Sequence, residues 1–366
     1  MTPVPAGCAS PLSSMVSERS VVVCTGPGGV GKTTIAAAIA MEGARAGRRS
    51  VVVTIDPAKR LGDALGLSLS NEPRRIEGDW PGELWALMLD TKSTFDSLVA
   101  KYAPGPDQAE AILANRFYRN ISGALSGTQE YMAMEKLHEL HEDARFDLVV
   151  VDTPPTRNAL DFLDAPRRLT HFLDHRVFRL LMLPARASIK AVNVATQAFL
   201  RTVARVVGSD VVQDAVSFFQ AFEGMEDGFR ERSGRVLALL TDPGTAFVLV
   251  TAPRPDVVAE AEYFAGKLAD GGIPIGALVV NRMHPRFAPE WSEVARERAR
   301  TLATTALGPL YDNLADLHQL ADGEEAQVAA VVARVAPAPW VGVPFLSSDV
   351  HDLDGLAAVG HHLFAA

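Results

Sequence analysis

Residues 21–34 combine an apolar, β-branched run, a glycine-rich turn and the start of a helix-forming run. Residues 26–33 fit the pattern Gly-x-x-x-x-Gly-Lys-Ser/Thr, in the strand–loop–helix setting that this pattern requires. Glycines let successive backbone N–H groups surround phosphate oxygens, and the positive end of the following helix points at the same place. A turn that only joins a strand to a helix is disfavoured, because seven consecutive residues fit. The stretch therefore predicts a site for nucleotide phosphates.

The side chains of this loop divide by chemistry. Lys32 is predicted to reach the β- and γ-phosphates and to act in catalysis, and the Thr33 hydroxyl is predicted to bind Mg²⁺. The residues expected to contact the nucleotide phosphates are Gly28, Gly29, Val30, Gly31, Lys32, Thr33 and Thr34.

Two aspartates stand where buried-strand patterns end, Asp56 after residues 50–55 and Asp152 after residues 146–151. In open α/β sheets, ligands bind at the carboxyl ends of the strands. Asp56 could orient an attacking water or hold a water on Mg²⁺, or it could simply cap a loop. Asp152 completes a Walker B pattern, so we expect it to anchor the Mg²⁺ hydration shell opposite Thr33.

Residues 28–34, Gly-Gly-Val-Gly-Lys-Thr-Thr, resemble the deviant P-loop of the ArsA-type family, which includes arsenite-pump ATPases and tail-anchored-protein targeting ATPases. The Asp-Pro-Ala at residues 56–58 is similar to the family's switch I, and residues 152–160 are similar to its switch II. The resemblance implies an ATPase with ATP and Mg²⁺ as cofactors. It also favours Asp56 as the catalytic carboxylate over the loop-cap interpretation.

The chain departs from the family pattern at three positions. The family has a lysine directly before the Gly-Gly pair, which reaches across a dimer to the partner's nucleotide, whereas this chain has Pro27. Proline carries neither charge nor N–H. We therefore expect a heterodimer with a lysine-bearing paralogue, with self-association as the alternative. In switch II, Arg157 replaces glycine and Asn158 replaces histidine. Arg157 is either a substitute positive charge or a surface arginine.

The resemblance also implies an adenine site near the end of the chain. Asn281 follows a buried-strand pattern, and its amide offers both a donor and an acceptor to an adenine edge. The family places an Asn-Lys or Asn-Arg pair there for that purpose. Pro344 and Phe345 are assigned to a loop that closes over the adenine.

The strand patterns alternate with helical stretches, which predicts right-handed crossovers and an α/β fold. We expect a doubly wound, mainly parallel P-loop NTPase sheet of about seven or eight strands. The ATPase domain is predicted to cover residues 19–366, with a helical subdomain inserted at about 160–240. Residues 1–18 are rich in Pro, Ser and Gly, and we predict a disordered tail there.

Eight of the sixteen phenylalanines fall between Phe162 and Phe229, within the predicted helical subdomain. They could form the core of a helical layer, or part of an apolar groove for a partner. The family's variable helical subdomain has the second role. The predicted partner is accordingly a hydrophobic protein client or a membrane protein.

Composition narrows the class further. The net charge of −9 argues against nucleic-acid binding, which needs a basic excess. Two cysteines, Cys8 and Cys24, cannot supply the three thiolates that an arsenite site would need, and they suit a reducing cytoplasm. Without an apolar run of about 18 residues, we expect membrane association only through a partner. The alternative function is a weakly hydrolysing or non-hydrolysing nucleotide-gated chaperone or regulatory subunit.

Overall fold

The computed structural model describes residues 11–56, 60–121, 128–154, 208–221, 224–287 and 291–365. The chain divides into two compact units. The sheet unit comprises Met1–Met88, Asp143–Ala159 and Pro243–Ala366. The helical unit comprises Leu89–Glu142 and Leu160–Asp242.

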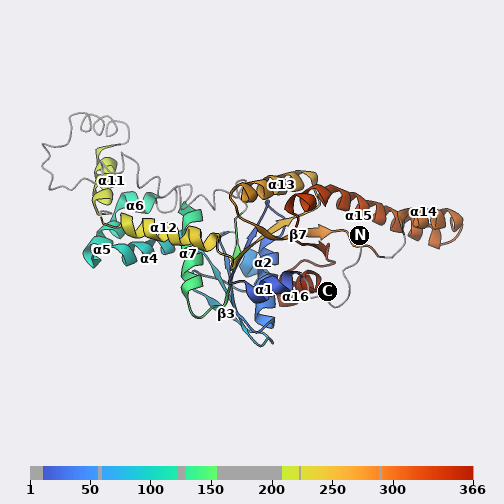
Figure 1. Ribbon diagram of the computed structural model, residues 1–366, viewed down its shortest axis with the longest axis horizontal. Helices are drawn as coiled ribbons and strands as arrows, with labels where there is room; N and C mark the ends of the chain where they lie inside the picture. The colour runs from blue at the N-terminus through green and yellow to red at the C-terminus, as the bar shows by residue number, and fades with distance from the viewer. Residues whose placement is uncertain are drawn as a thin grey trace. The chain divides into compact units, whose positions relative to one another are not determined.

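The sheet unit contains an eight-stranded sheet in the order β3-β4-β2-β5-β1-β6-β7-β8 (Figure 1). Its strands are β1 (Val21–Thr25), β2 (Arg49–Thr54), β3 (Arg74–Ile76), β4 (Glu83–Met88), β5 (Leu148–Asp152), β6 (Thr245–Thr251), β7 (Ile275–Met283) and β8 (Trp340–Pro344). Every pairing is parallel except that of β3 with β4. The predicted doubly wound, mainly parallel α/β sheet is confirmed. The short edge strand β3 was not predicted, because Arg-Arg-Ile contains no apolar run.

Helices cover both faces of this sheet (Figure 1). Those of the sheet unit are α1 (Pro11–Glu18), α2 (Lys32–Arg45), α3 (Arg60–Leu65), α13 (Pro255–Asp270), α14 (Ser292–Thr301), α15 (Leu307–Val335) and α16 (Leu353–Phe364). Helices α1, α2 and α16 share one hydrophobic core, and α13 and α15 share the other.

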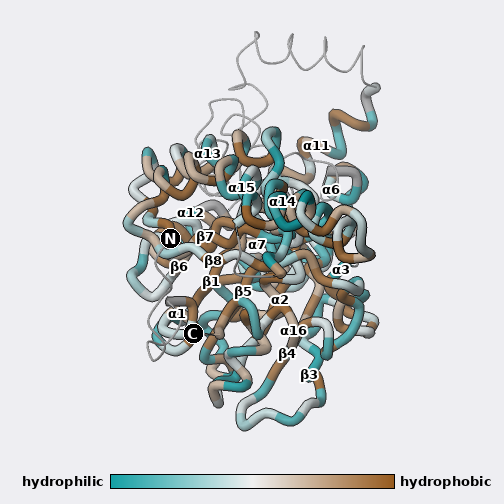
Figure 2. The backbone as a smooth tube through the Cα atoms, turned by 90° about the vertical axis from the view of Figure 1, so that its right-hand side faces the viewer, coloured by the Kyte–Doolittle hydropathy of each residue, from teal (hydrophilic) through white to brown (hydrophobic). Residues whose placement is uncertain are grey.

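Successive side chains of β6 and β7 enter opposite cores. In β6, Val248 and Val250 pack with α2, whereas Leu249 packs with α13 and α15. Alternation along a strand produces this split. Because both faces are covered, the strands are apolar throughout rather than alternately polar. Figure 2 shows β1 and β5 in the brown of hydrophobic residues.

Part of the predicted disordered tail, residues 1–18, is helical in the structure. Residues Pro11–Glu18 form α1, in which Leu12, Met15 and Val16 are buried. Their spacing of three and four residues places them on one helix face, which packs into the core with α2 and α16. Residues 1–10 lie outside the described part of the chain.

The helical unit draws on two separate stretches of sequence. Its described helices are α4 (Thr91–Tyr102), α5 (Pro106–Ala114), α6 (Arg116–Ile121), α7 (Thr128–Glu142), α11 (Ser209–Ala221) and α12 (Glu226–Leu240). The helical subdomain is predicted from the sequence at about 160–240, whereas the helical unit also includes α4 to α7, which precede β5.

Three of the eight clustered phenylalanines are described, and Phe218, Phe219 and Phe229 are all buried. Phe218 stacks on Tyr118 with ring centroids 5.9 Å apart, and Phe229 packs against Tyr102 at 5.5 Å. These three therefore serve the core of the helical unit. The other five lie outside the described residues, so an apolar client surface stays a prediction.

Candidate functional site

The parallel register of three central strands places the candidate site at one edge of the sheet. In β5, Asp152 lies level with Cys24 of β1 and with Thr54 of β2. The P-loop leaves β1 one residue beyond this level, and Asp56 follows β2 two residues beyond it. Residues far apart in sequence therefore meet because their strands end together.

The P-loop itself depends on glycine at three positions. Gly26 has φ 144°, Gly29 has φ 76° and Gly31 has φ 90°, values that residues other than glycine rarely adopt. A Cβ at Gly31 would also collide with the amide nitrogen of Asn281. Lys32 begins α2, and its Nζ donates a hydrogen bond of 2.8 Å to the carbonyl of Pro27. Burial lowers the pKa of Lys32, while nearby carboxylates oppose the shift.

Asp152 is the buried acid of the site. Its Oδ2 accepts hydrogen bonds from the hydroxyls of Thr33 at 2.7 Å and Thr54 at 2.8 Å. Its Oδ1 is buried and has no hydrogen-bond partner among the described residues. Burial raises the pKa of Asp152 to about 6, although both threonine hydroxyls oppose the rise. An unpaired carboxylate oxygen beside a hydroxyl fits Mg²⁺, which is bound through one or two such oxygens together with substrate phosphates.

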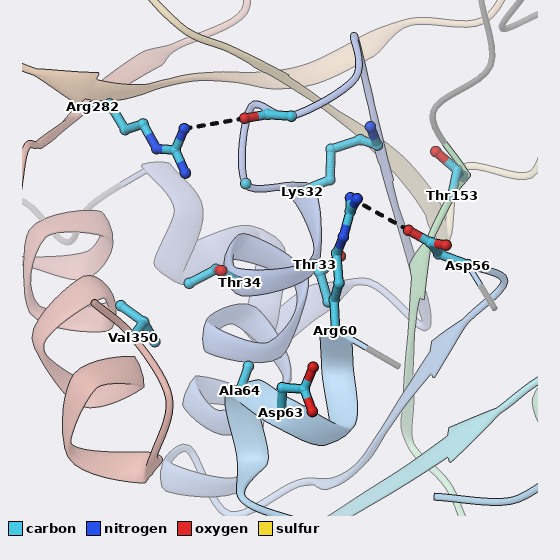
Figure 3. A pocket seen from close by; sticks show the side chains of 12 residues that line it. Lys32, Thr33, Thr34, Asp56, Arg60, Asp63, Ala64, Thr153, Arg282 and Val350 are labelled. Atoms are coloured by element: carbon cyan, nitrogen blue, oxygen red, sulfur yellow. Dashed lines mark hydrogen bonds and ion pairs between the residues drawn. The ribbon is translucent and has the colours of Figure 1, made fainter. Parts of the chain in front are cut away.

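Asp56 lies directly after β2 and is 8% exposed. Its backbone N–H donates to the Thr54 hydroxyl oxygen at 3.2 Å, so Thr54 contacts both predicted acids. The Asp56 carboxylate faces the Arg60 guanidinium, with 3.5 Å between Oδ2 and Nη1 (Figure 3). The intervening residues 57–59 lie outside the described part of the chain.

A pocket of about 360 Å³ brings most of these groups together (Figure 3). Its lining residues are Gly29, Gly31, Lys32, Thr33, Thr34, Asp56, Arg60, Asp63, Ala64, Thr153, Arg282 and Val350. The six predicted residues among them are Gly29, Gly31, Lys32, Thr33, Thr34 and Asp56. Gly28 is exposed at the turn, and Asp152 contacts the pocket-lining Thr33.

Sequence reasoning missed two contributors. Thr54 carried a usable signal, because a threonine two residues before an acid at a strand end can bond to that acid's backbone. Arg60 carried a weaker one, a charged residue four positions after Asp56 in the predicted switch I.

The predicted adenine residues have other contacts in this structure. The Asn281 side-chain amide donates to the Val30 carbonyl at 2.8 Å, and its oxygen accepts from the backbone N–H of Arg282. Pro344 ends β8, and the following Phe345 is 59% exposed, with its ring stacked on His284. Neither Pro344 nor Phe345 lines the pocket. Their role toward adenine, like that of Asn281, stays a prediction.

The predicted switch II residues Arg157 and Asn158 lie outside the described residues. Cys24 is buried and unpaired with another cysteine. Across the described ranges, no group of three or more His, Cys, Asp and Glu is arranged to hold a metal ion. Within the same ranges, no helix has the length and apolar character needed to cross a membrane.

Comparison with known proteins gives matches along most of the chain. A sequence model of the family described as "Anion-transporting ATPase" matches residues 19–320. An uncharacterized protein of Streptomyces coelicolor is 30% identical over 269 residues, 73% of this chain and 63% of the relative, so the match spans just under two thirds of that protein. ATPase GET3 of Malassezia globosa is 25% identical over 79% of this chain and 80% of its own length. ATPase GET3C of Arabidopsis thaliana is 27% identical over 76% and 71%.

Proposed function

The chain belongs to the anion-transporting ATPase family, and we propose that it is a Mg²⁺-dependent ATP-binding and ATP-hydrolysing subunit of an ArsA-like ATPase. The observation that carries the proposal is the Asp152 carboxylate, which is hydrogen-bonded to Thr33 of the P-loop and whose other buried oxygen has no partner within the described part of the chain. The names of the relatives, which describe ATPases, support the same reaction.

In the proposed reaction, a water oxygen forms a bond to the γ-phosphorus. The bond from that phosphorus to the β–γ bridging oxygen breaks, and its electron pair stays on ADP. One proton of the attacking water passes to an oxygen of the phosphate that is released. Asp56 orients the attacking water and accepts its hydrogen bond, and Lys32 leaves the Pro27 carbonyl to contact the β- and γ-phosphates. Thr33 and Asp152 would hold Mg²⁺, which neutralises phosphate charge when it is bound with the nucleotide.

Two substitutions test this assignment in the full chain. Asp56→Asn should abolish turnover while ATP still binds. Asp152→Asn should lower turnover on the order of 10³-fold and shift the Mg²⁺ requirement upward. Asp256→Asn is the matched control, because this aspartate is 67% exposed on α13. Turnover by Asp56→Asn equal to that of the unsubstituted protein would contradict the assignment.

The second part of the proposal concerns the dimer. Pro27 contributes no charge before the Gly-Gly pair, and its carbonyl oxygen accepts a hydrogen bond from the Lys32 ammonium. We propose a heterodimer in which a lysine-bearing paralogue completes this chain's site and receives no lysine in return. Turnover of this chain alone should fall well below that of an equimolar mixture with the paralogue. Equal activity per site in both samples would favour self-association instead.

The proposed output is nucleotide control of a surface on the helical unit, which would bind a hydrophobic protein client or a membrane-protein partner in the cytoplasm. The competing function is a nucleotide-gated chaperone or regulatory subunit with little or no hydrolysis. Asp56→Asn separates the two, because client binding driven by ATP alone should survive that substitution. Affinity capture of the ATP-bound protein, followed by identification of bound chains, tests the paralogue and the client together.

A further inference from the structure

We propose that Arg60 is a catalytic residue of this site, which contacts the γ-phosphate of bound ATP and releases Asp56 as it does so. The inference rests on the proposed ATP site and deepens it, by assigning a γ-phosphate sensor within the same chain. It concerns Arg60 of α3 and is separate from the switch II arginine.

The pocket itself distinguishes Arg60 from the other cations. Three of its described lining residues are positively charged, Lys32, Arg60 and Arg282. The Lys32 ammonium donates to the Pro27 carbonyl, and the Arg282 guanidinium donates to the Gly29 carbonyl at 3.3 Å. Both of these therefore contact the P-loop backbone. Arg60 instead faces the carboxylate that is proposed to orient water (Figure 3).

Helix α3 holds the Arg60 backbone firmly while it leaves the side chain free to move. Leu61 and Leu65 of this helix are buried in the core shared with α2, whereas Arg60, Asp63 and Ala64 line the pocket. The Arg60 side chain is 58% exposed, and the Asp56 side chain is 12% exposed. An ion pair with one partner so exposed is weak and is readily exchanged.

Arg60 should prefer the γ-phosphate to Asp56 as its partner. Asp56 offers Arg60 a single negative charge, whereas a γ-phosphate offers about two charges and three acceptor oxygens. A guanidinium matches phosphate oxygens in a bidentate manner. Because Nη1 of Arg60 lies 3.5 Å from the Asp56 carboxylate, a γ-phosphorus beside a water held by Asp56 is within reach of the same side chain.

This arrangement makes ATP and ADP unequal ligands. With ADP, no γ-phosphate is present, and Arg60 stays paired with Asp56. With ATP, the guanidinium moves to the γ-phosphate oxygens, where it stabilises the negative charge of the transferring phosphoryl group. The Asp56 carboxylate, no longer paired with Arg60, then binds the attacking water. Arg60 remains protonated throughout, so it neither gives nor takes a proton in the reaction.

The test compares the unsubstituted protein with the variants Arg60→Ala and Arg60→Lys, and with Arg254→Ala as the control. Arg254 also pairs with an aspartate, Asp256, but on an exposed surface. Calorimetry in the presence of Mg²⁺ measures the affinities for ADP and for the β,γ-imido analogue of ATP, and a phosphate-release assay measures kcat. Unchanged affinity for ADP shows that each variant is folded around the site.

For Arg60→Ala we expect analogue affinity to fall about tenfold and ADP affinity to change less than about twofold. We expect kcat to fall on the order of 10³-fold, the scale of arginine contributions to phosphoryl transfer. Arg60→Lys should recover part of both losses, and Arg254→Ala neither. Equal loss for ADP and the analogue, or kcat within about threefold of the unsubstituted protein, would overturn the inference.

The outcome also separates this inference from the function on which it rests. If the unsubstituted protein releases no phosphate either alone or in an equimolar mixture with a lysine-bearing paralogue, hydrolysis fails as the proposed function. The ratio of analogue to ADP affinity then decides alone for or against Arg60. If hydrolysis occurs and Arg60→Ala retains it, Arg60 is excluded while the ATPase assignment stands. If Arg60→Ala does not fold, the charge-retaining Arg60→Lys decides through the same ratio.

Discussion

Two buried carboxylates, Glu135 in the helical unit and Asp152 in the sheet unit, show opposite ways of holding a charge inside this protein. Each is 1% exposed. Glu135 accepts from the Tyr131 hydroxyl at 2.6 Å on one oxygen and from the Arg232 Nε at 2.8 Å on the other. One oxygen of Asp152 accepts hydrogen bonds from two threonine hydroxyls. The other oxygen accepts none from a described residue, and Asp152 forms no ion pair with one.

The difference separates a structural charge from one reserved for a ligand. Burying a carboxylate is unfavourable unless hydrogen bonds and opposite charge compensate for the lost water. The polypeptide supplies Glu135 with a hydroxyl and a guanidinium, although burial still raises the pKa of this carboxyl. Asp152 receives hydrogen bonds on only one of its oxygens, so the other can still bind a cation. The nucleotide-free site is therefore less stable than it would be with partners on both oxygens.

The largest expected effect comes from breaking the complete arrangement. Glu135→Ala leaves the buried Arg232 guanidinium without its main partner, so we expect the helical unit to lose about 3–5 kcal/mol. All four tryptophans, Trp80, Trp85, Trp291 and Trp340, belong to the sheet unit. Urea unfolding followed by far-UV circular dichroism should therefore show an early transition that tryptophan fluorescence does not.

The control for this experiment is an exposed pair in the same unit. Glu231 is 67% exposed and contacts Arg235 at 2.7 Å. Glu231→Ala should change stability by no more than about 1 kcal/mol. Similar shifts for the two substitutions would mean that Glu135 is not held by the buried pair.

A smaller effect should follow from the incomplete arrangement, through pH. The pKa of Asp152 is raised to about 6, above its ordinary 3.8. The folded state therefore holds this proton more tightly than the unfolded state does, and stability falls as pH rises from about 4 through about 6. The raised pKa corresponds to about 3 kcal/mol. Asp152→Asn, without nucleotide, should gain stability relative to the unsubstituted protein across that window.

Urea midpoints by tryptophan fluorescence at several pH values between 4 and 7.5 measure this difference. The comparison with Asp152→Asn removes contributions from the other titrating groups, which both proteins share. If the stability difference between the unsubstituted protein and Asp152→Asn does not vary with pH, ionisation of Asp152 does not destabilise the folded state.

The smallest effect concerns Thr54. Thr54→Val removes the hydroxyl that bonds to Asp152 and to the backbone of Asp56, so we expect a loss of about 1–2 kcal/mol and a further rise in the pKa of Asp152. Thr251 at the end of β6 is the matched control, because its buried hydroxyl bonds to none of the residues that the structure describes. Thr251→Val should be neutral or stabilising, and a loss as large as that of Thr54→Val would argue against the Thr54 contacts.

What the sequence revealed depended on how local each signal was. The strands around Val22 and Val150 were predicted because buried parallel strands are continuously apolar, and the P-loop because its residues are adjacent. Helix α1 was missed, since its three apolar residues follow a Pro- and Ser-rich stretch. The joining of α4–α7 with α11 and α12 depends on contacts across some ninety residues, such as the one between Glu135 and Arg232.

The candidate site follows the same rule. Asp56, Lys32 and Thr33 were predicted from adjacent motifs, and the pocket brings them together. Arg60 has no such motif, because its position matters only through the direction in which α3 runs after β2. The contact of Asn281 with Val30 could not be read from the sequence either, since the two residues are 251 positions apart.

The central place of β1 has a consequence for how the protein is made. This strand is synthesised before both of its neighbours, β5 and β6, which end at Asp152 and Thr251. Until residue 251 has been synthesised, one edge of β1 has no strand to pair with. Long-range pairing of this kind is slow and exposes apolar strand edges. The nucleotide loop is thus synthesised before the strands that fix its position, and β1 can pair on both edges only after some 220 further residues have followed it.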